Sequence, residues 1–144
     1  MSKNKSNLKI YCISHKYIKE LDKLNLNIIG SGAHKRKFPK NWLNDSMGQK
    51  HISKKNFNYG TLTSIYWIWK NHIKYLKQDD YIGICHYRRF WLKKNHDKKI
   101  RLNNLKKNLL SSIPYKYNKF DAFVCSPQSL KGYKLSKLIK KGKR

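Results

Sequence analysis

The sequence predicts an α/β protein with a Rossmann-like, mostly parallel sheet flanked by helices. Two observations carry this prediction. Short β-rich runs lie at 8–13, 25–29, 81–85 and 120–125, and an amphipathic segment, 59–76, separates the second run from the third. Strands that alternate with helical segments are typical of a parallel sheet. The 144 residues correspond to about one domain and can bury a real core.

The first two expected strands are short and bounded by polar residues. The run LKIYCI at 8–13 has the length and composition of a strand, and a short helix is expected at 17–24. The run NLNII at 25–29 then stops at Gly30 and Gly32. These glycines are by themselves a weak signal for a phosphate-binding loop, because GSG is shorter than a GxGxxG motif.

A long surface loop is expected at 33–56. The segment is polar, contains Pro39 and shows no sustained hydrophobic period. Loops of this length commonly have a function or are mobile. We expect Trp42 to anchor this loop on the core.

The segment 59–76 has the clearest helical pattern, with Asn58 as its expected N-cap. Its apolar residues predict one core-facing stripe, formed by Leu62, Ile65, Tyr66, Trp69, Ile73 and Leu76. Another side of the same helix carries Thr63, Trp67, Lys70, Asn71 and Lys74. Two alternatives stay open for Trp67: its indole lines a groove as a stacking surface beside Lys70 and Asn71, or it packs beneath the long loop.

The rest of the chain continues the alternation. A turn at 78–80 precedes the third strand, 81–85, and a short helix is expected at 100–110 before the fourth strand, 120–125, which Pro127 ends. Ligands of parallel sheets bind beyond the carboxyl ends of the strands. The segments expected there are Ser14–His15, Gly30–Gly32, His86–Arg89 and Ser126.

Three regions are expected along the chain. Residues 1–7 form a disordered basic N-terminus, 8–128 form the domain, and 129–144 form a basic tail or truncated helix. The tail interleaves leucines with lysines and ends without closing another strand. We therefore expect the fold to be incomplete at its C-terminal end.

The formal charge of +27 results from 34 Lys and Arg against 7 Asp and Glu. Such an excess is usual in proteins that bind nucleic acid, an anionic membrane or phosphorylated substrates. Nearly all of it is lysine, in a chain rich in Asn and Ile, which an AT-rich genome produces without selection for binding. Arginine is the residue expected where bases are read. Specific nucleic-acid binding is therefore not predicted, although non-specific binding through lysines and aromatics stays an alternative function.

The cysteines and the hydropathy pattern indicate a reduced compartment. Cys12, Cys85 and Cys125 lie in or beside apolar runs without CxxC spacing, which predicts reduced, buried thiols. No stretch resembles a signal peptide or reaches the roughly 20 apolar residues of a membrane-spanning helix. We expect a cytoplasmic protein whose only membrane contact is peripheral, at the anionic inner face of the cytoplasmic membrane.

The histidines show no HExxH motif, so no metal site is predicted.

The stretch CHYRRF at 85–90 directly follows the third expected strand. Arg88 and Arg89 either pair with acidic side chains of the same fold or bind an anion such as a diphosphate with their guanidinium forks. The second alternative is favoured because the chain has only 7 carboxylates for 34 basic side chains. His86 is either a structural residue or a general acid or base, since its ordinary pKa of about 6.5 lies near working pH.

Three longer runs carry a resemblance to a known family. They are NDSMGQKHISKKN at 44–56, LTSIYWIWKN at 62–71 and DYIGICHYRRF at 80–90. In this order they resemble a family of bacterial capsular and exopolysaccharide biosynthesis proteins, long described as a domain of unknown function, that contains glycosyltransferases. The segment FDAFVCSP at 120–127 resembles the strand that follows in the family. The combination of YWxWKN with CHYRR makes the resemblance specific.

The resemblance implies a glycosyltransferase of GT-A-like architecture. Its donor would be a nucleotide-diphospho-sugar, with a UDP-sugar expected, and its acceptor a growing capsular, exopolysaccharide or lipopolysaccharide glycan, free or lipid-linked. Arg88 and Arg89 would stabilise the leaving diphosphate, Tyr87 would position the sugar or nucleotide, and His86 is a candidate base. The same cleft would be lined by His15, Gly30, Asn56, Thr63, Trp67, Lys70 and Asn71.

Several positions depart from the family pattern. Thr61 stands where the family has Glu, and Lys50 and His51 stand where it has Asp. Many GT-A-like enzymes hold a metal with a DxD motif, which this sequence lacks, so a role for a divalent metal stays open. Family members continue well beyond this length, and we expect this chain to match their N-terminal, donor-binding part. A catalytically inactive homologue that keeps the nucleotide site is a further alternative.

Overall fold

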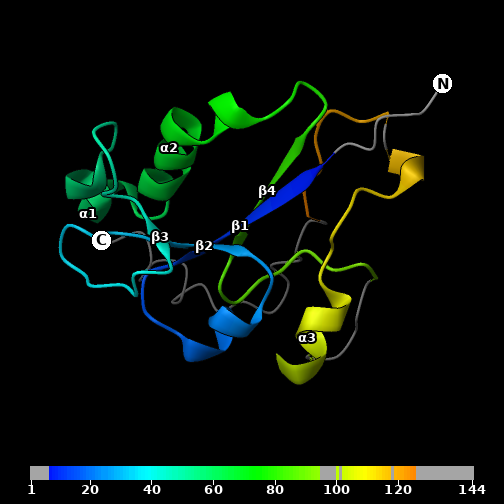
Figure 1. Cartoon of the computed structure of the whole chain (residues 1–144), viewed down its shortest axis with the longest axis horizontal. Coiled ribbons are helices and arrows are strands. Elements are labelled where there is room, and N and C mark those ends of the chain that lie inside the picture. The colour runs from blue at the N-terminus through cyan, green and yellow to red at the C-terminus, as the bar shows by residue number, and fades with distance from the viewer. Residues whose placement is uncertain (1–6, 95–99, 101, 118, 126–144) are drawn as a thin grey trace, which may run out of the picture. The chain divides into compact units, whose positions relative to one another are not determined.

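A four-stranded parallel sheet forms the centre of the structure (Figure 1). The computed structural model describes residues 7–94, 100, 102–117 and 119–125. The strand order is β3-β2-β1-β4. The strands are β1 (Leu8–Ser14), β2 (Asn27–Gly30), β3 (Leu43–Asn44) and β4 (Tyr81–His86). The predicted parallel α/β sheet is therefore confirmed, with three of its strands close to the predicted positions.

Short helices connect the strands. The α-helices are α1 (Asn56–Tyr59), α2 (Leu62–Asn71) and α3 (Leu102–Asn108), and the 3-10 helices are η1 (Lys19–Lys23), η2 (Ser53–Lys55), η3 (Ile73–Tyr75) and η4 (Tyr115–Tyr117). The helix expected at 17–24 is the 3-10 turn η1. The long helix expected at 59–76 is shorter, because the chain tightens into η3 after His72.

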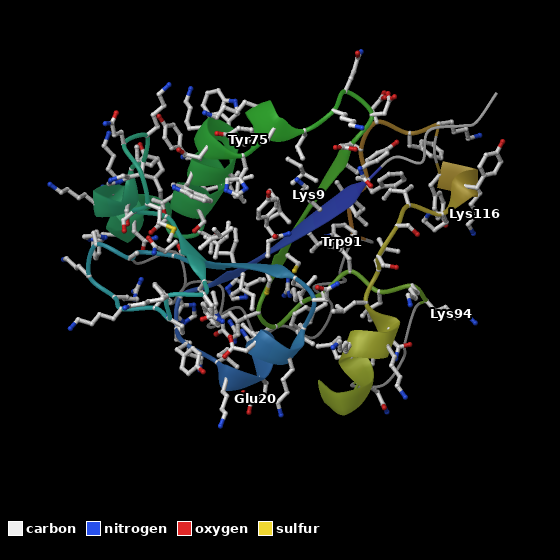
Figure 2. All side chains as sticks on the ribbon, viewed as in Figure 1. Lys9, Glu20, Tyr75, Trp91, Lys94 and Lys116 are labelled. Atoms are coloured by element: carbon white, nitrogen blue, oxygen red, sulfur yellow. The ribbon has the colours of Figure 1, made fainter. Side chains whose placement is uncertain are left out.

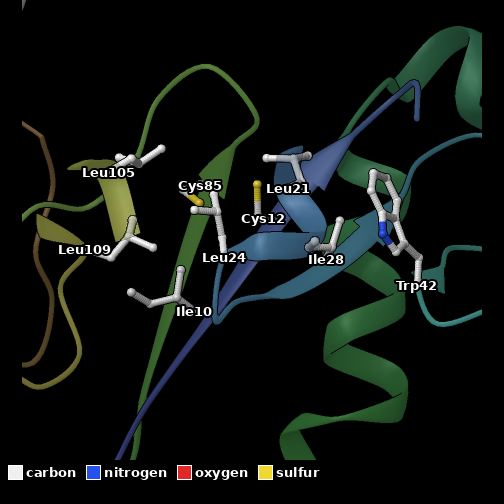
Figure 3. Close-up of a cluster of buried hydrophobic side chains, with 9 residues drawn as sticks. All are labelled: Ile10, Cys12, Leu21, Leu24, Ile28, Trp42, Cys85, Leu105 and Leu109. Atoms are coloured by element: carbon white, nitrogen blue, oxygen red, sulfur yellow. The ribbon is translucent and has the colours of Figure 1, made fainter. Parts of the chain in front are cut away.

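The two faces of the sheet are covered by different helices, as Figure 1 shows for α2 and α3. Successive side chains of a strand point to opposite faces. Cys12 of β1 accordingly joins a cluster with residues of η1 and α3, drawn in Figure 3, and Tyr11 joins a second cluster with Trp67 and Ile68 of α2. This layered arrangement is the Rossmann-like architecture that the sequence predicts.

The predicted core face of α2 is wrong. Its buried residues are Thr63, Ser64, Trp67 and Ile68. Two residues of the expected stripe, Leu62 and Trp69, are instead 55% and 54% exposed. Trp67 and Ile68 of this face pack with Tyr11 and Ile29 of the sheet, whereas Thr63 is buried through its hydrogen bond to Asp45. Asn58 is not the N-cap of α2, because it lies inside α1, and the N-cap is Thr61.

The expected loop at 33–56 contains regular structure that the sequence did not reveal. Strand β3 pairs with β2, with Leu43 opposite Ile29 and Asn44 opposite Gly30. A strand of two residues is too short to show the alternation of apolar and polar residues from which a strand is predicted. Trp42 is 2% exposed, and its Nε1 donates to Asp22 Oδ1 at 2.5 Å, which confirms that it anchors this segment.

The described residues divide into two compact units between Ile113 and Pro114. In the second unit the strand expected at 120–125 is wrong: the segment is irregular, and Val124 is 89% exposed. Its aromatic residues contact one another instead, with ring centroids of Phe120 and Phe123 6.1 Å apart. The expected domain limits of 8–128 stay a prediction, and residues 1–6 of the N-terminus expected at 1–7 and the whole tail expected at 129–144 lie outside the described residues.

The cysteines fall into two environments. Cys12 and Cys85 are buried at paired positions of β1 and β4. A hydrogen bond between the two thiols, together with burial, raises the pKa of Cys12 far above its ordinary range. Cys125 is exposed, so its expected burial is wrong, because the expected strand around it does not form.

Across the described part of the chain, no helix has the length and apolarity needed to cross a membrane.

Candidate functional site

The candidate site lies where β1 and β4 end side by side. Strands β2 and β3 lie next to β1 in the direction of one edge of the sheet, and β4 pairs with β1 at the opposite edge. The carboxyl ends of β1 and β4 therefore flank the point at which the strand order reverses, the usual ligand position of such sheets. His15 directly follows β1, and His86 is the last residue of β4.

Three aromatic rings meet at these strand ends. The ring centroid of Tyr87 lies 4.3 Å from that of His86 and 5.1 Å from that of His15. The two imidazoles are 6.1 Å apart. The backbone N–H of Tyr87 donates to the carbonyl of Ile13 at 3.1 Å, which extends the pairing of the two strands past the end of β4. The structure thus brings together three of the predicted site residues.

A tight turn explains why β4 ends in CHYRRF. The N–H of Arg89 donates to the carbonyl of His86 at 2.7 Å, and the N–H of His86 donates back at 3.2 Å. The chain then runs back along β4, where Nε1 of Trp91, labelled in Figure 2, donates to the carbonyl of Ile84 at 3.0 Å. His86 thus ends β4, an edge strand of which only Cys85 is buried, and residues 87–89 form the turn that follows.

The two arginines of the turn differ in their surroundings. The guanidinium carbon of Arg88 lies 5.2 Å from the ring centroid of Tyr87, and Nζ of Lys16 lies 5.7 Å from the same centroid. Both arginines are exposed, and Arg89 bonds through its backbone. Neither arginine forms an ion pair within the described residues, so the structure gives no support to the alternative in which they pair with acidic side chains.

Both histidines are surrounded by positive charge. Desolvation is the main cause that lowers the pKa of His15, and Arg36, Lys16 and Arg88 lower it further. Desolvation also lowers the pKa of His86, assisted first by Arg88 and then by His15 and Arg89. Each imidazole is therefore neutral at neutral pH and carries a nitrogen that can accept a proton.

A buried carboxylate that the sequence did not single out organises the loops beside these strand ends. Asp45 is fully buried. It accepts hydrogen bonds from the N–H groups of Gly32 and Ala33 at 2.8 and 2.9 Å, from Ser53 Oγ at 2.8 Å and from Thr63 Oγ1 at 2.5 Å. No pattern in the sequence distinguishes Asp45 from the other six carboxylates of the chain.

Asn56 and Thr63, both predicted site residues, belong to this network. Nδ2 of Asn56 donates to Ser31 Oγ at 3.0 Å, Thr63 Oγ1 at 2.9 Å and the carbonyl of Gly60 at 2.7 Å. Its Oδ1 accepts a hydrogen bond from Nη1 of Arg36 at 3.3 Å. Asn56 thus orients an arginine that the sequence analysis did not assign to the site.

The other predicted residues hold the surrounding backbone. Trp67 is 4% exposed, and its Nε1 donates to the carbonyl of Met47 at 2.8 Å, so the structure favours packing beneath the loop over a groove surface. Nδ2 of Asn71 donates to the carbonyl of Lys50 at 3.0 Å. Nζ of Lys70 lies 3.5 Å from the ring centroid of exposed Trp69. Gly30 packs against the ring of Phe38, since an added Cβ would lie 2.3 Å from that ring.

Comparisons with known proteins place the chain in a family. The apo structure of WbbM, a bifunctional glycosyltransferase, is 28% identical to this chain, with a TM-score of 0.49, over 66% of this chain and 16% of that chain. This chain thus spans a small part of the length of WbbM. No curated protein matches it. The sequence model of a domain of unknown function, DUF4422, matches residues 9–139, and the chain therefore belongs to the DUF4422 family.

Proposed function

We propose that this chain is the donor-binding part of a glycosyltransferase that moves a sugar from a nucleotide-diphospho-sugar to a growing surface glycan of a bacterium. One observation carries the proposal. Arg88 lies beside His15, His86 and Tyr87 at the switch point of a parallel sheet, without an acidic partner among the described residues. A cationic position at this edge is suited to a diphosphate. The motifs YWxWKN and CHYRR, which resemble those of polysaccharide biosynthesis proteins, agree with this proposal.

Positive charge at this edge would assist the chemical step. When the bond between the anomeric carbon and the diphosphate oxygen breaks, its electron pair stays on the leaving oxygen, and negative charge increases there. Arg88 would stabilise that charge through hydrogen bonds that are strongest when the acceptor is ionised. Tyr87 lies next to Arg88 and would contact the nucleotide or the sugar.

A base would be needed for the acceptor hydroxyl. The lowered pKa of His86 leaves its imidazole neutral at neutral pH, so it could take the proton that the hydroxyl loses on attack. His15 would be the second neutral imidazole of the same edge. Asn56 and Thr63 would act by fixing the loop after β2, and Trp67 and Asn71 by holding the segment at 47–50.

Calorimetric titration with UDP and UDP-galactose tests this proposal. At about 0.15 M salt, attraction between exposed charges is largely screened beyond roughly 8 Å, so general binding to lysines is suppressed. We expect saturable binding by the natural chain and a loss of roughly tenfold or more in affinity for Arg88→Ala. Lys94→Ala removes one exposed positive charge away from this turn, as Figure 2 shows, and should bind normally. No binding of either ligand by the natural chain would contradict the proposal.

A second candidate function is non-specific binding of single-stranded nucleic acid. The outward face of α2 and η3 favours it, because Trp69 and Tyr75 are 54% and 70% exposed and carry lysine amines over their rings. Figure 2 labels Tyr75 on this face. Bases stack on such rings, and lysines attract the backbone. This function predicts binding that weakens steeply with salt and depends on Trp69 but not on Arg88.

A further inference from the structure

We infer that Arg36, and not Arg89, is the second guanidinium of the diphosphate site, so that the diphosphate lies across the end of β1 between the loop after β2 and the turn after β4. This inference rests on the proposed function and deepens it. The sequence pairs Arg88 with its neighbour Arg89 because they are adjacent in the chain. The structure brings an arginine from a separate loop to the same strand ends.

The backbone places Arg36 beside β1. Nη1 of Arg36 donates to the carbonyl of Ser31 at 3.1 Å. The N–H of Ser31 in turn donates to the carbonyl of Ser14, the last residue of β1, at 2.8 Å. His15 follows immediately. Arg36 is therefore bonded to Ser31, whose backbone pairs with the residue that precedes His15.

Arg88 approaches the same histidine from the other side. The N–H of Tyr87 bonds to Ile13 of β1, the ring of Tyr87 lies 5.1 Å from that of His15, and Arg88 lies over the ring of Tyr87. The charges agree with this placement. Among the cations that lower the pKa of His15, Arg36 has the largest effect, and Arg88 contributes too. Arg89 lowers the pKa of His86 but is not among the groups that lower the pKa of His15.

The guanidinium of Arg36 is held in place but keeps donors for a ligand. Both of its side-chain hydrogen bonds within the described residues use Nη1, with Ser31 and Asn56 as acceptors. A guanidinium has five N–H donors, so those on Nη2 and Nε remain for an anion. Arg36 forms no ion pair in the part of the chain that the structure describes, and no carboxylate competes for these donors.

The neighbouring backbone is adapted to this arginine. Gly32 has φ +76, a conformation that favours glycine, and an added Cβ would lie 2.3 Å from Nη1 of Arg36 and 2.7 Å from Oδ1 of Asn56. Asp45 fixes the N–H of Gly32, and Asn56 is fixed by its own three hydrogen bonds. Such preorganisation reduces the entropy that a side chain loses on binding a ligand.

Titration with UDP and with inorganic pyrophosphate, which lacks a base and sugar, tests the inference. We expect Arg36→Ala and Arg88→Ala each to lower the affinity for both ligands roughly tenfold or more, whereas Arg89→Ala changes it less than threefold. Lys35→Ala is the matched control, since it removes one exposed charge from the same loop. Arg36→Lys keeps the charge without the fork and should bind several-fold more weakly than the natural chain.

The outcomes separate the inference from the proposed function. If Arg36→Ala and Arg36→Lys bind like the natural chain while Arg88→Ala does not, Arg36 is only a structural residue, and the inference is overturned while the proposed function stands. If Arg89→Ala loses as much affinity as Arg88→Ala while the Arg36 variants do not, the adjacent pair is the site. If the natural chain binds neither ligand, both the inference and the proposed function are overturned. Thermal unfolding of each variant identifies losses of affinity that result from misfolding. If Arg36→Ala does not fold, the affinity of Arg36→Lys decides the test.

Discussion

The hydroxyl of Thr63 donates to the carboxylate of Asp45 at 2.5 Å, and this contact joins helix α2 to the loop that follows β2. Both residues are fully buried. Because the same carboxylate also accepts the N–H groups of Gly32 and Ala33, the helix and the strand end are fixed by one side chain. The position of the candidate site thus depends on a residue that lies beneath it.

Asp45→Asn should destabilise the fold strongly. Asn has one oxygen where Asp has two, and its amide nitrogen would face donors that need an acceptor. Leaving buried donors unsatisfied costs about 1–3 kcal/mol for each group, so we expect a loss of roughly 2–4 kcal/mol in the free energy of unfolding. Urea unfolding followed by circular dichroism measures it. Asp79→Asn, at an exposed turn, is the control and should change little. Equal stability of Asp45→Asn and the natural chain would refute the role of the network.

The two tryptophans of the motif YWxWKN should respond oppositely to truncation. Trp67 is 4% exposed and Trp69 is 54% exposed. Trp67→Ala should cost about 3–5 kcal/mol of unfolding free energy because it leaves a cavity. Trp67→Phe should cost about 1 kcal/mol for the lost hydrogen bond, in addition to the cost of replacing the indole by a smaller ring. Trp69→Ala should stay within about 1 kcal/mol. Unfolding in guanidinium measures the free energy of unfolding of each variant. A larger loss for Trp69→Ala than for Trp67→Ala would support the core face predicted from the sequence.

The strands could be predicted because their signals are local. The apolar runs that form β1, β2 and β4 stop at glycines or polar residues, and the observed strands stop within one or two residues of those positions. The segment at 120–125 has the same β-rich composition but no place in the described sheet. Strand formation requires a partner, and composition alone does not reveal one.

The candidate site could be predicted only where it follows strand ends. His15, His86 and Tyr87 were found in this way, and the structure brings them together. Arg36 and Asp45 were missed because their partners lie 5 to 20 residues away in the chain, in loops without a recognisable pattern. The core face of α2 was misjudged because Thr63 is buried in a hydrogen-bond network with Asp45, and hydrophobic periodicity does not reveal buried polar residues.

One of the three thiols should react rapidly. Cys125 is exposed, whereas Cys12 and Cys85 are buried. The hydrogen bond to Cys85 and burial both raise the pKa of Cys12, so little thiolate forms there, and thiolate is the reactive species. A chromogenic disulfide reagent should titrate one thiol per folded chain and all three in denaturant. Cys125→Ser should remove the rapid reaction. Two rapid equivalents in the natural chain would show that β1 and β4 open at their centre.

Donor binding should strengthen as the pH falls from 8 to 5.5. In the free protein, desolvation and the cations Arg36, Lys16, Arg88 and Arg89 lower the pKa values of His15 and His86 below about 6.5, so both imidazoles are neutral at pH 7. A bound diphosphate would add negative charge beside them and raise both pKa values. The complex would then hold more protons than the free protein, and by linkage the dissociation constant must fall as the pH falls.

UDP-galactose is the ligand to use for this measurement, because both of its phosphates are esterified and do not titrate in this range. Calorimetry at pH 6 in two buffers with different ionisation enthalpies measures the protons taken up, and a positive uptake is expected. The double variant His15→Gln/His86→Gln should bind with an affinity that does not depend on pH. An unchanged dissociation constant for the natural chain between pH 8 and 5.5 would mean that the phosphates do not lie beside these two histidines, which would move the donor away from the β1–β4 edge.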